Sequence, residues 1–303
     1  MLSGEKILVT GVTGKSVLPV AKALARDNEV WGMARFADPA ARAEVEALGI
    51  KTFAADIGSG QYEGLPTDFT RLAHFAWMRA ELDQLQEAIR VNVEGAGLML
   101  QHCRNARSAL VVSSQGVYTP HDDPFHAYSE TDPIGRGATP YAATSPATKL
   151  GLEAVARFCA RAFNLPVTIA RLNTVYGVDG AYYSIMIEKV LDGHEVVVPW
   201  DPNPHAPVHT LDMQQQVHAL LEAATIPATI VNWCGDETVV TQEVLAHLKE
   251  MSGVAAKLKV SFVESAPKGN NNDPTRRKAI TGPSTVKFRE AYAELYRGIA
   301  ARR

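Results

Sequence analysis

The chain has 303 residues, of which 46% are hydrophobic and 21% are charged, and its formal net charge at pH 7 is -3. It is long enough for two domains, or for one large domain with an appended lobe. The balanced charge argues against a nucleic-acid partner or an acidic membrane surface, which need concentrated basic residues. The short basic run at 276–278 is interpreted as the solvated start of a helix.

We expect neither a membrane protein nor a secreted one. No stretch approaches the ~20 apolar residues that span a bilayer, and MLSGEKILVTG at the amino terminus lacks the apolar core of a secretion signal. The three cysteines at 103, 159 and 234 are widely spaced and lack metal-ligand spacing, so we expect buried thiols in a reducing compartment. The expected location is the cytoplasm.

Short apolar runs alternate with longer segments of helical period through the first part of the chain. Strands are predicted at 6–10, 29–34, 51–55, 71–76, 109–114 and 167–172, with helices at 17–26, 39–48, 82–103 and 146–163. This alternation predicts an α/β fold, in which parallel strands are joined by right-handed helical crossovers into a doubly wound sheet.

After residue 175 the rhythm changes. Helices are predicted at 183–191, 211–224 and 241–251, with a Pro-rich loop at 199–207 and a polar surface loop at 267–277. We therefore predict a sheet domain over 1–175 and a smaller substrate-binding lobe over 176–303, some of whose segments return to the sheet. Such a lobe would cover the sheet edge where ligands of open α/β sheets bind.

The first strand ends in a glycine turn, VTGVTGKSVLPVAKAL. A glycine pair between a strand and a helix lets backbone N–H groups approach a pyrophosphate, which predicts a dinucleotide-binding Rossmann domain; a plain tight turn is the alternative. The third glycine of the usual pattern is replaced by Val17, which predicts a slightly displaced helix. The candidate cofactor contacts in the turn are Gly11, Thr13, Gly14, Lys15 and Ser16.

The second strand, EVWGMAR, ends in Ala34 and Arg35 instead of an acidic residue that would bind the adenosine ribose. Without that carboxylate nothing repels a 2′-phosphate, and a guanidinium can bind the phosphate with two hydrogen bonds. Lys15 adds positive charge nearby. We predict NADP as the cofactor, with NAD as the alternative; an arginine that merely solvates the strand end also fits.

A set of short segments along the chain forms a known pattern: TGVTG at 10–14, AADI at 54–57, HFA at 74–76, VNVEG at 91–95, VVSSQGVY at 111–118, ETDP at 130–133, RLNTVYG at 171–177 and VHTLD at 208–212. Together they resemble the extended short-chain dehydrogenase/reductase superfamily, specifically the NAD-dependent epimerase/dehydratase family. The resemblance implies that Asp56 contacts the adenine, that Ile57 beside it also binds the cofactor, that Ala76 lies against the cofactor, and that Asn92 orders the central strands. It also implies a homodimer that pairs through the helices at 82–103 and 146–163.

The same family uses a serine or threonine on a central strand, and a tyrosine four residues before a lysine on one helix face. By this resemblance Ser114 is the serine and Lys149 is the lysine, which in the family holds the nicotinamide ribose. The register then places Ser145 where the family has its catalytic tyrosine.

Tyr141 is a candidate substitute for the missing tyrosine. Eight residues of continuous helix would separate it from Lys149 by about 12 Å, and Pro146 interrupts such a helix. We predict that Ser145 is the N-cap and Pro146 the first helical residue, which leaves Tyr141 on the preceding loop. That loop could return the phenol to Lys149; otherwise Ser145 only caps the helix and fills the pocket.

The segment after the catalytic strand offers other acids and bases. These are Ser114, Tyr118, His121, Asp122, Asp123 and His126. We interpret HDDPFH at 121–126 as a polar surface loop without a third anchored ligand, and so predict no metal.

Substrate contacts are assigned by the same resemblance and by nearby aromatic residues. The candidates are Trp77, Asn173, Thr174 and Tyr182. The segment WDPNPHAPVH at 200–209 contains no arginine or lysine, and an unpaired diphosphate is costly to desolvate. We therefore expect a small, less charged substrate and not a nucleotide sugar.

Three functions remain open. The first is an NAD(P)-dependent oxidoreductase or epimerase acting on a carbonyl or alcohol carbon with altered acid/base residues. The second is a non-redox isomerase or lyase on the same fold. The third is a catalytically silent, NADP-sensing scaffold.

Overall fold

The protein is represented by a computed structural model that describes residues 1–135, 137 and 142–303. The chain divides into two compact units. The first contains the described residues within 1–114, 141–171 and 214–231, and the second those within 115–140, 172–213 and 232–303. Within the described residues no helix is long and apolar enough to cross a bilayer.

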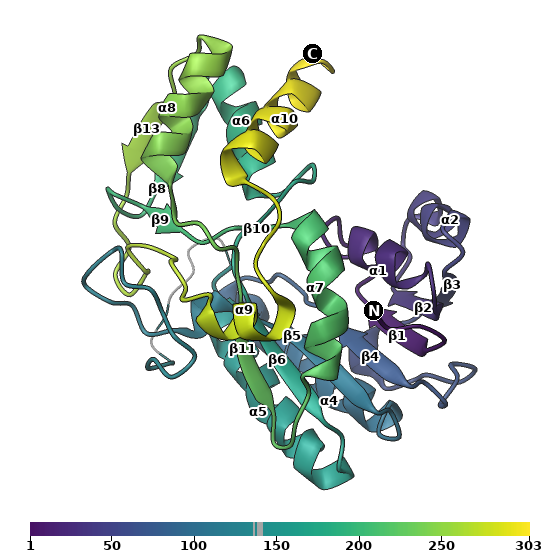
Figure 1. Ribbon diagram of the computed structural model, residues 1–303. Coiled ribbons are helices and arrows are strands. Elements are labelled where there is room, and N and C mark those ends of the chain that lie inside the picture. The colour runs from purple at the N-terminus through teal and green to yellow at the C-terminus, as the bar shows by residue number, and fades with distance from the viewer. Residues whose placement is uncertain (136, 138–141) are drawn as a thin grey trace. The chain divides into compact units, whose positions relative to one another are not determined.

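The first unit is built on a seven-stranded sheet in the order β11-β6-β5-β4-β1-β2-β3 (Figure 1). Its strands are β1 (Lys6–Thr10), β2 (Glu29–Ala34), β3 (Lys51–Ala54), β4 (Arg71–His74), β5 (Ser108–Ser114), β6 (Val167–Leu172) and β11 (Thr229–Trp233). Strand β1 pairs in parallel with both β2 and β4. The strand order therefore reverses between β1 and β4, which is where open α/β sheets bind ligands.

Helices flank this sheet. They are α1 (Leu18–Leu24), α2 (Pro39–Ala47), α3 (Leu85–Ile89), α4 (Gly95–His102), α5 (Ser145–Phe163) and most of α7 (Thr210–Glu222). Between α3 and α4 the chain makes a π-helical turn, Arg90–Glu94. Short 3-10 turns lie at Ile57–Ser59 and Leu82–Gln84.

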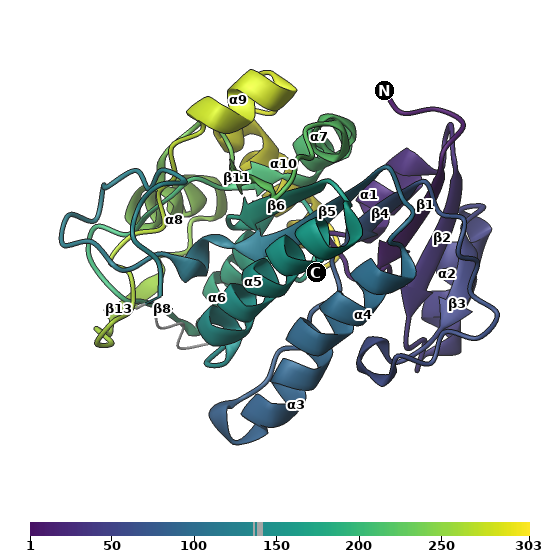
Figure 2. The same ribbon diagram turned by 90° about the horizontal axis from the view of Figure 1, so that it is seen from below.

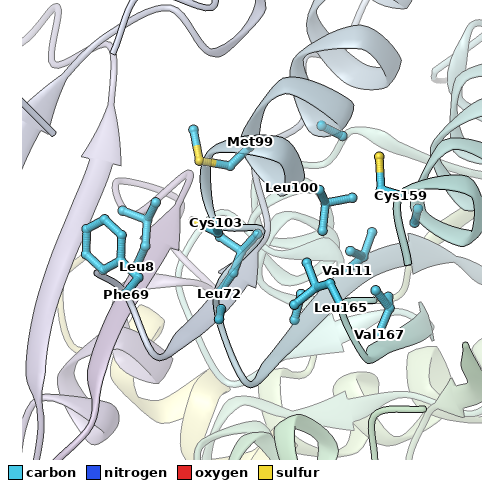
Figure 3. Packing of buried hydrophobic residues seen from close by; sticks show 14 of the residues in the cluster. Leu8, Phe69, Leu72, Met99, Leu100, Cys103, Val111, Cys159, Leu165 and Val167 are labelled. Carbon is cyan, nitrogen blue, oxygen red and sulfur yellow. The ribbon is translucent and has the colours of Figure 1, made fainter. Parts of the chain in front are cut away.

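The main core of the first unit lies between the sheet and helices α4 and α5, which run side by side (Figure 2). Figure 3 shows Met99 and Leu100 of α4, and Cys103 just after it, packed with strand residues such as Leu72 and Val111. Removing this apolar surface from water is the principal stabilising contribution. All three cysteines are buried free thiols, as predicted.

The close approach of α5 to the π-helical turn depends on Gly151. A Cβ atom at Gly151 would lie 2.8 Å from Val93 Cγ2. A larger residue would have to displace the Val93 side chain or move α5 away from the turn.

The second unit contains short strands and helices. They are β7 (Val175–Tyr176), α6 (Tyr182–Leu191), β8 (Glu195–Val198), β9 (Pro204–His205), β10 (Val208–His209), β12 (Val239–Val240), α8 (Thr241–Ser252), β13 (Lys257–Val260), α9 (Thr275–Thr281) and α10 (Phe288–Ala300). Its core is rich in aromatic residues, with Phe288 and Tyr292 of α10 stacked at 5.5 Å.

Several predicted elements agree with the structure. The strands predicted at 6–10, 29–34 and 167–172 match β1, β2 and β6 at both ends, and most of the predicted helices differ by one or two residues. The seven strands and flanking helices confirm the predicted doubly wound α/β class.

The prediction of a polar surface loop at 267–277 is wrong. Asn271, Asn272 and Arg277 are buried, and Arg277 forms an ion pair with Asp236. The segment is polar because its side chains and main chain form hydrogen bonds inside the second unit, for example Asn271 Nδ2 to the Phe125 carbonyl oxygen at 3.2 Å. The basic run at 276–278 is likewise not fully solvated.

Candidate cofactor and catalytic site

The glycine turn after β1 requires the absence of a side chain. Gly11 has φ of +71°, and a Cβ atom there would lie 2.9 Å from the Cα atom of Ala76, which follows β4. The Gly14 amide donates to the Gly11 carbonyl oxygen at 2.9 Å and closes the turn. Helix α1 begins just beyond, with Val17 buried at the position of the missing third glycine.

Thr10 holds the ends of β1 and β4 together. Its hydroxyl accepts hydrogen bonds from the amides of Phe75 and Ala76 at 3.2 and 3.1 Å, and lies 3.0 Å from His74 Nδ1. Since the hydroxyl accepts twice, its proton goes to His74 Nδ1, which leaves the imidazole proton on Nε2. Burial, assisted by the charge of Lys149, lowers the pKa of His74 to about 3, so the ring is neutral.

The chain after β4 is fixed a second time by Asn92 in the π-helical turn. The Asn92 side chain accepts from the Met78 amide at 2.6 Å and donates to the Met78 carbonyl oxygen at 2.9 Å. Trp77 therefore lies between two anchored residues, Ala76 and Met78. The resemblance assigned Asn92 an ordering role, and these bonds give it a specific target.

Lys149 of α5 is buried, with 7% of its surface exposed. Its ammonium donates to the Val112 carbonyl oxygen of β5 at 2.8 Å and lies 5.6 Å from the centroid of the Trp77 ring. Burial lowers the pKa of Lys149 to about 7, although the nearby Glu153 carboxylate acts in the opposite direction. The side chain is therefore poised to change charge near neutral pH.

The prediction that Ser145 is an N-cap is wrong by one residue. Helix α5 begins at Ser145, and Thr144 precedes it with φ of -83° and ψ of -10°. The proline fits the first turn because its missing N–H has no intrahelical acceptor there. Ser145 and Lys149 are both buried one turn apart. Tyr141 lies outside the described residues, so its approach to Lys149 stays a prediction.

A buried ion pair that the sequence analysis missed fixes the register of α5. Arg171 Nε and Nη2 lie 3.0 and 2.9 Å from the two carboxylate oxygens of Glu153, which also accepts from the Ser113 hydroxyl at 2.7 Å. Glu153 stands one turn after Lys149, so the pair ties α5 to β5 and β6 beside the site. Ser114, the predicted catalytic serine, ends β5 and is half-buried.

The predicted adenosine-binding residues lie at the ends of β2 and β3. Asp56 accepts from the Gly58 amide at 3.0 Å and pairs with Arg90 Nη2 at 2.6 Å. Burial favours the neutral acid, but the bonds from Arg90 and Gly58 outweigh it and hold the pKa of Asp56 below its usual range. Arg35 is exposed and its charge acts on Asp56 in the same direction.

The remaining predicted cofactor contacts differ in exposure. Thr13 and Lys15 are exposed on the turn, Ser16 is half-buried, and Ile57 is buried beside Asp56. The structure thus leaves the basic group of Lys15 accessible on the turn.

Three of the predicted substrate residues lie in the second unit. The Asn173 side chain donates to the Asn270 carbonyl oxygen at 2.7 Å and accepts from the Thr174 amide at 2.6 Å, so it holds the loop. Thr174 Oγ1 lies 3.2 Å from His205 Nδ1, and the Tyr182 ring lies 5.5 Å from the His205 ring.

His205 is a residue that sequence reasoning missed. It is buried, and burial lowers its pKa to about 4, so it is neutral. Its Nε2 lies 2.8 Å from Asn203 Oδ1. No signal in the surrounding Pro-rich segment pointed to it, because Thr174 is about thirty residues away in the chain.

A cation from elsewhere in the chain reaches the segment at 200–209. Lys268 Nζ lies 4.7 Å from the Trp200 ring centroid and donates to the carbonyl oxygen of Asp122 at 3.1 Å. The segment itself has no basic residue, but Lys268 therefore brings a positive charge next to it.

The His121 and His126 rings stack at 4.1 Å, and no group of three or more metal-ligating side chains occurs in the described part of the chain.

Comparison with known proteins identifies the family of this chain. The family model for the NAD dependent epimerase/dehydratase family matches residues 7–234. No match to a curated protein sequence was found.

Solved structures share the fold over nearly the whole chain. UDP-glucuronic acid 4-epimerase from Bacillus cereus, solved with UDP-glucuronic acid and NAD, has 21% identity and a TM-score of 0.83, covering 98% of this chain and 100% of its own. UDP-N-acetylglucosamine 4-epimerase from Methanobrevibacter ruminantium has 15% identity, a TM-score of 0.83 and full coverage of both chains. UDP-glucose 4-epimerase from Thermus thermophilus, solved with NAD, has 22% identity, a TM-score of 0.77 and coverage of 97% and 99%.

The family match takes in most of the chain, including the glycine turn, Lys149 and the ion pair that positions it. The chain therefore belongs to the NAD-dependent epimerase/dehydratase family and is a dehydrogenase- or epimerase-like enzyme.

Proposed function

We propose that the first unit binds a nicotinamide dinucleotide from the Gly11 turn to Lys149, and that the enzyme acts on a carbonyl or alcohol carbon of a small substrate. One observation carries this proposal. Gly11 contacts Ala76, the next residue Trp77 faces Lys149, and Lys149 bonds to Val112. A continuous series of contacts thus joins the turn, which lies where the strand order reverses, to an ionisable amine beside β5.

The residues present fit such a cofactor. The Gly11 turn has no room for a side chain, as close approach of a backbone to a pyrophosphate requires. Beside it, Trp77 Nε1 and His74 Nε2 are buried without a hydrogen-bond partner among the described residues. A bound nicotinamide would give or accept a hydride at the substrate carbon.

Lys149 and Ser114 are the side chains that we assign to proton handling. Burial lowers the pKa of Lys149 to about 7, so this side chain can give up or accept a proton near neutral pH. A serine hydroxyl at Ser145 is a far weaker acid than a phenol. We therefore regard Tyr141 as the first alternative donor and Ser145 as the second.

We propose NADP as the preferred form of the cofactor, with NAD second. Arg35 and Lys15 are exposed near the expected adenosine ribose, and Ala34 provides no carboxylate to repel a 2′-phosphate. The charge of Arg35 also acts on Asp56, the predicted adenine contact.

The proposed substrate is a small molecule, which Thr174 and Tyr182 of the second unit would contact, with His205 as a neutral neighbour. A nucleotide sugar is the second candidate. It is favoured by Lys268, which brings an ammonium to the Trp200 segment and could pair with a phosphate.

Further proposals concern organisation. We propose that residues 1–175 bind the cofactor, that residues 176–303 mainly bind the substrate, and that the enzyme is cytoplasmic.

A homodimer that forms through α4 and α5 would bury Phe158, which is 66% exposed on α5. A Phe158→Glu variant that stays as large as the wild type in light scattering would contradict this interface.

The proposed function is tested by direct binding and turnover. Purified protein is titrated with NADPH, NADP, NADH and NAD by nucleotide fluorescence, then given a panel of small carbonyls and alcohols and UDP-glucuronic acid. We expect tighter binding of the NADP pair and an absorbance change that Lys149→Ala abolishes. Binding without any turnover would favour the sensing alternative, and turnover without nucleotide would favour a non-redox isomerase or lyase.

A further inference from the structure

The indole of Trp77 is a buried hydrogen-bond donor that has no partner among the described residues. Its Nε1 atom is shielded in the free protein, whereas Trp77 as a whole is only half-buried, so part of the residue is accessible to a ligand. A buried N–H without an acceptor is destabilising, and an acceptor supplied by a ligand would remove that cost. Trp31 offers a contrast, because its Nε1 donates to Glu29 at 2.8 Å.

The backbone around Trp77 is fixed on both sides. Thr10 accepts from the amide of Ala76, and Asn92 bonds to both main-chain groups of Met78. The indole is thus carried by a segment that cannot easily turn away, which is what a binding group needs.

The surroundings of the indole favour an oxygen as its acceptor. The Lys149 ammonium lies 5.6 Å from the ring centroid, and two of its three N–H groups have no partner among the described residues. The indole N–H and the ammonium over the same ring would each attract a hydroxyl or carbonyl oxygen of a ligand. The adjoining residue Ala76 contacts the Gly11 turn, so a dinucleotide that begins at the turn passes this position.

We propose that Trp77 Nε1–H binds an oxygen of the nicotinamide-ribose half of the cofactor. This role rests on the proposed cofactor site and adds to it a specific donor that no family motif quoted above contains. It makes Trp77 a cofactor-binding residue and not simply a wall of the substrate pocket.

The experiment compares Trp77→Phe with Trp31→Phe as the matched control. Phenylalanine keeps an aromatic face for Lys149 but deletes the N–H. Each variant is titrated with NADPH and with 2′,5′-ADP, which carries the adenosine half alone; NADH and ADP replace them if the wild type prefers NAD. Urea unfolding of the free proteins and the indole N–H signals in a proton–nitrogen NMR spectrum are recorded in parallel.

We expect Trp77→Phe to weaken NADPH binding by roughly three- to tenfold, the effect of one hydrogen bond, while 2′,5′-ADP binding is unchanged. The Trp77 indole N–H signal is identified as the one that is absent from the spectrum of Trp77→Phe. In the wild-type spectrum we expect this signal to shift when NADPH is added and not when 2′,5′-ADP is added. The free variant is as stable as wild type or more so, because an unsatisfied donor has been removed. Trp31→Phe leaves both affinities unchanged.

Two results overturn the inference. One is equal NADPH affinity in Trp77→Phe and wild type, which would assign the acceptor elsewhere, for example to the substrate. The other is an equal loss for both nucleotides, which would indicate general damage to the fold. If the wild type itself binds no dinucleotide, the proposed function fails first, so the two failures are distinguishable.

Discussion

Replacement of Lys149 by methionine should change how the stability of the free protein depends on pH. Lys149 is buried, and its pKa falls from 10.5 to about 7. Each pKa unit corresponds to about 1.4 kcal/mol, so holding the charged form inside the fold costs about 5 kcal/mol relative to the unfolded chain.

The sign follows from proton counts. Below pH 7 both the folded and the unfolded states hold the proton, and the cost is constant. Between pH 7 and 10.5 the unfolded state keeps the proton while the folded state releases it, so the free energy of unfolding of the wild type rises with pH. Lys149→Met removes this contribution, although it also leaves the Val112 carbonyl without its donor, at a cost of about 1–3 kcal/mol.

The assay is urea unfolding of wild type and Lys149→Met between pH 6 and pH 9. We expect the variant to gain most relative to wild type at pH 6, and to lose about 2–3 kcal/mol of that advantage between pH 7 and pH 9. The exposed Lys22→Met on α1 serves as the control and should run parallel to wild type. Parallel profiles for wild type and Lys149→Met would refute the reasoning, because they would mean that the ammonium does not titrate inside the fold.

Three other changes test the site from different directions. Arg35→Ala should weaken NADPH binding about tenfold with little effect on NADH, and equal losses in fluorescence titrations would remove Arg35 from the 2′-phosphate. Glu153→Gln should cost about 3–5 kcal/mol in urea unfolding, because it leaves the buried guanidinium of Arg171 without its carboxylate; a loss under about 1 kcal/mol would contradict that account. Gly11→Ala should abolish dinucleotide binding in the same titration, whereas Gly4→Ala, at a similar φ of +69° but with open space around it, should not.

The glycine turn and the shared helix face of Ser145 and Lys149 were predictable because their causes are local. A strand, two glycines and a helix are adjacent in sequence, and helical spacing alone puts Ser145 and Lys149 on one face. The strand ends of β1 and β6 followed from short apolar runs bounded by polar residues.

Features formed by residues that are distant in the chain could not be predicted from the sequence. His205 contacts Thr174 only in the folded protein. Asparagine is typical of surface loops, so nothing in the sequence indicated that Asn271 is buried and hydrogen-bonded. Strands of two residues, such as β7 and β10, have no periodicity to detect, and the four residues of β13 are all exposed. Helix α10 is different, because Phe288, Ala291, Tyr292 and Ile299 are buried at helical spacing, a pattern that was present in the sequence.

The π-helical turn at Arg90–Glu94 limits how this protein can be re-engineered. It accommodates one residue more than a regular α-helix would need, and in doing so directs Arg90 to Asp56 and Asn92 to Met78. Deleting a single residue there would yield a more regular helix but rotate one of these side chains by about 100° around the axis. A design that removes this residue to obtain an ideal helix would therefore lose one of the two contacts. These contacts connect the turn to Asp56, after β3, and to Met78, after β4, in the region where we propose that the ligand binds.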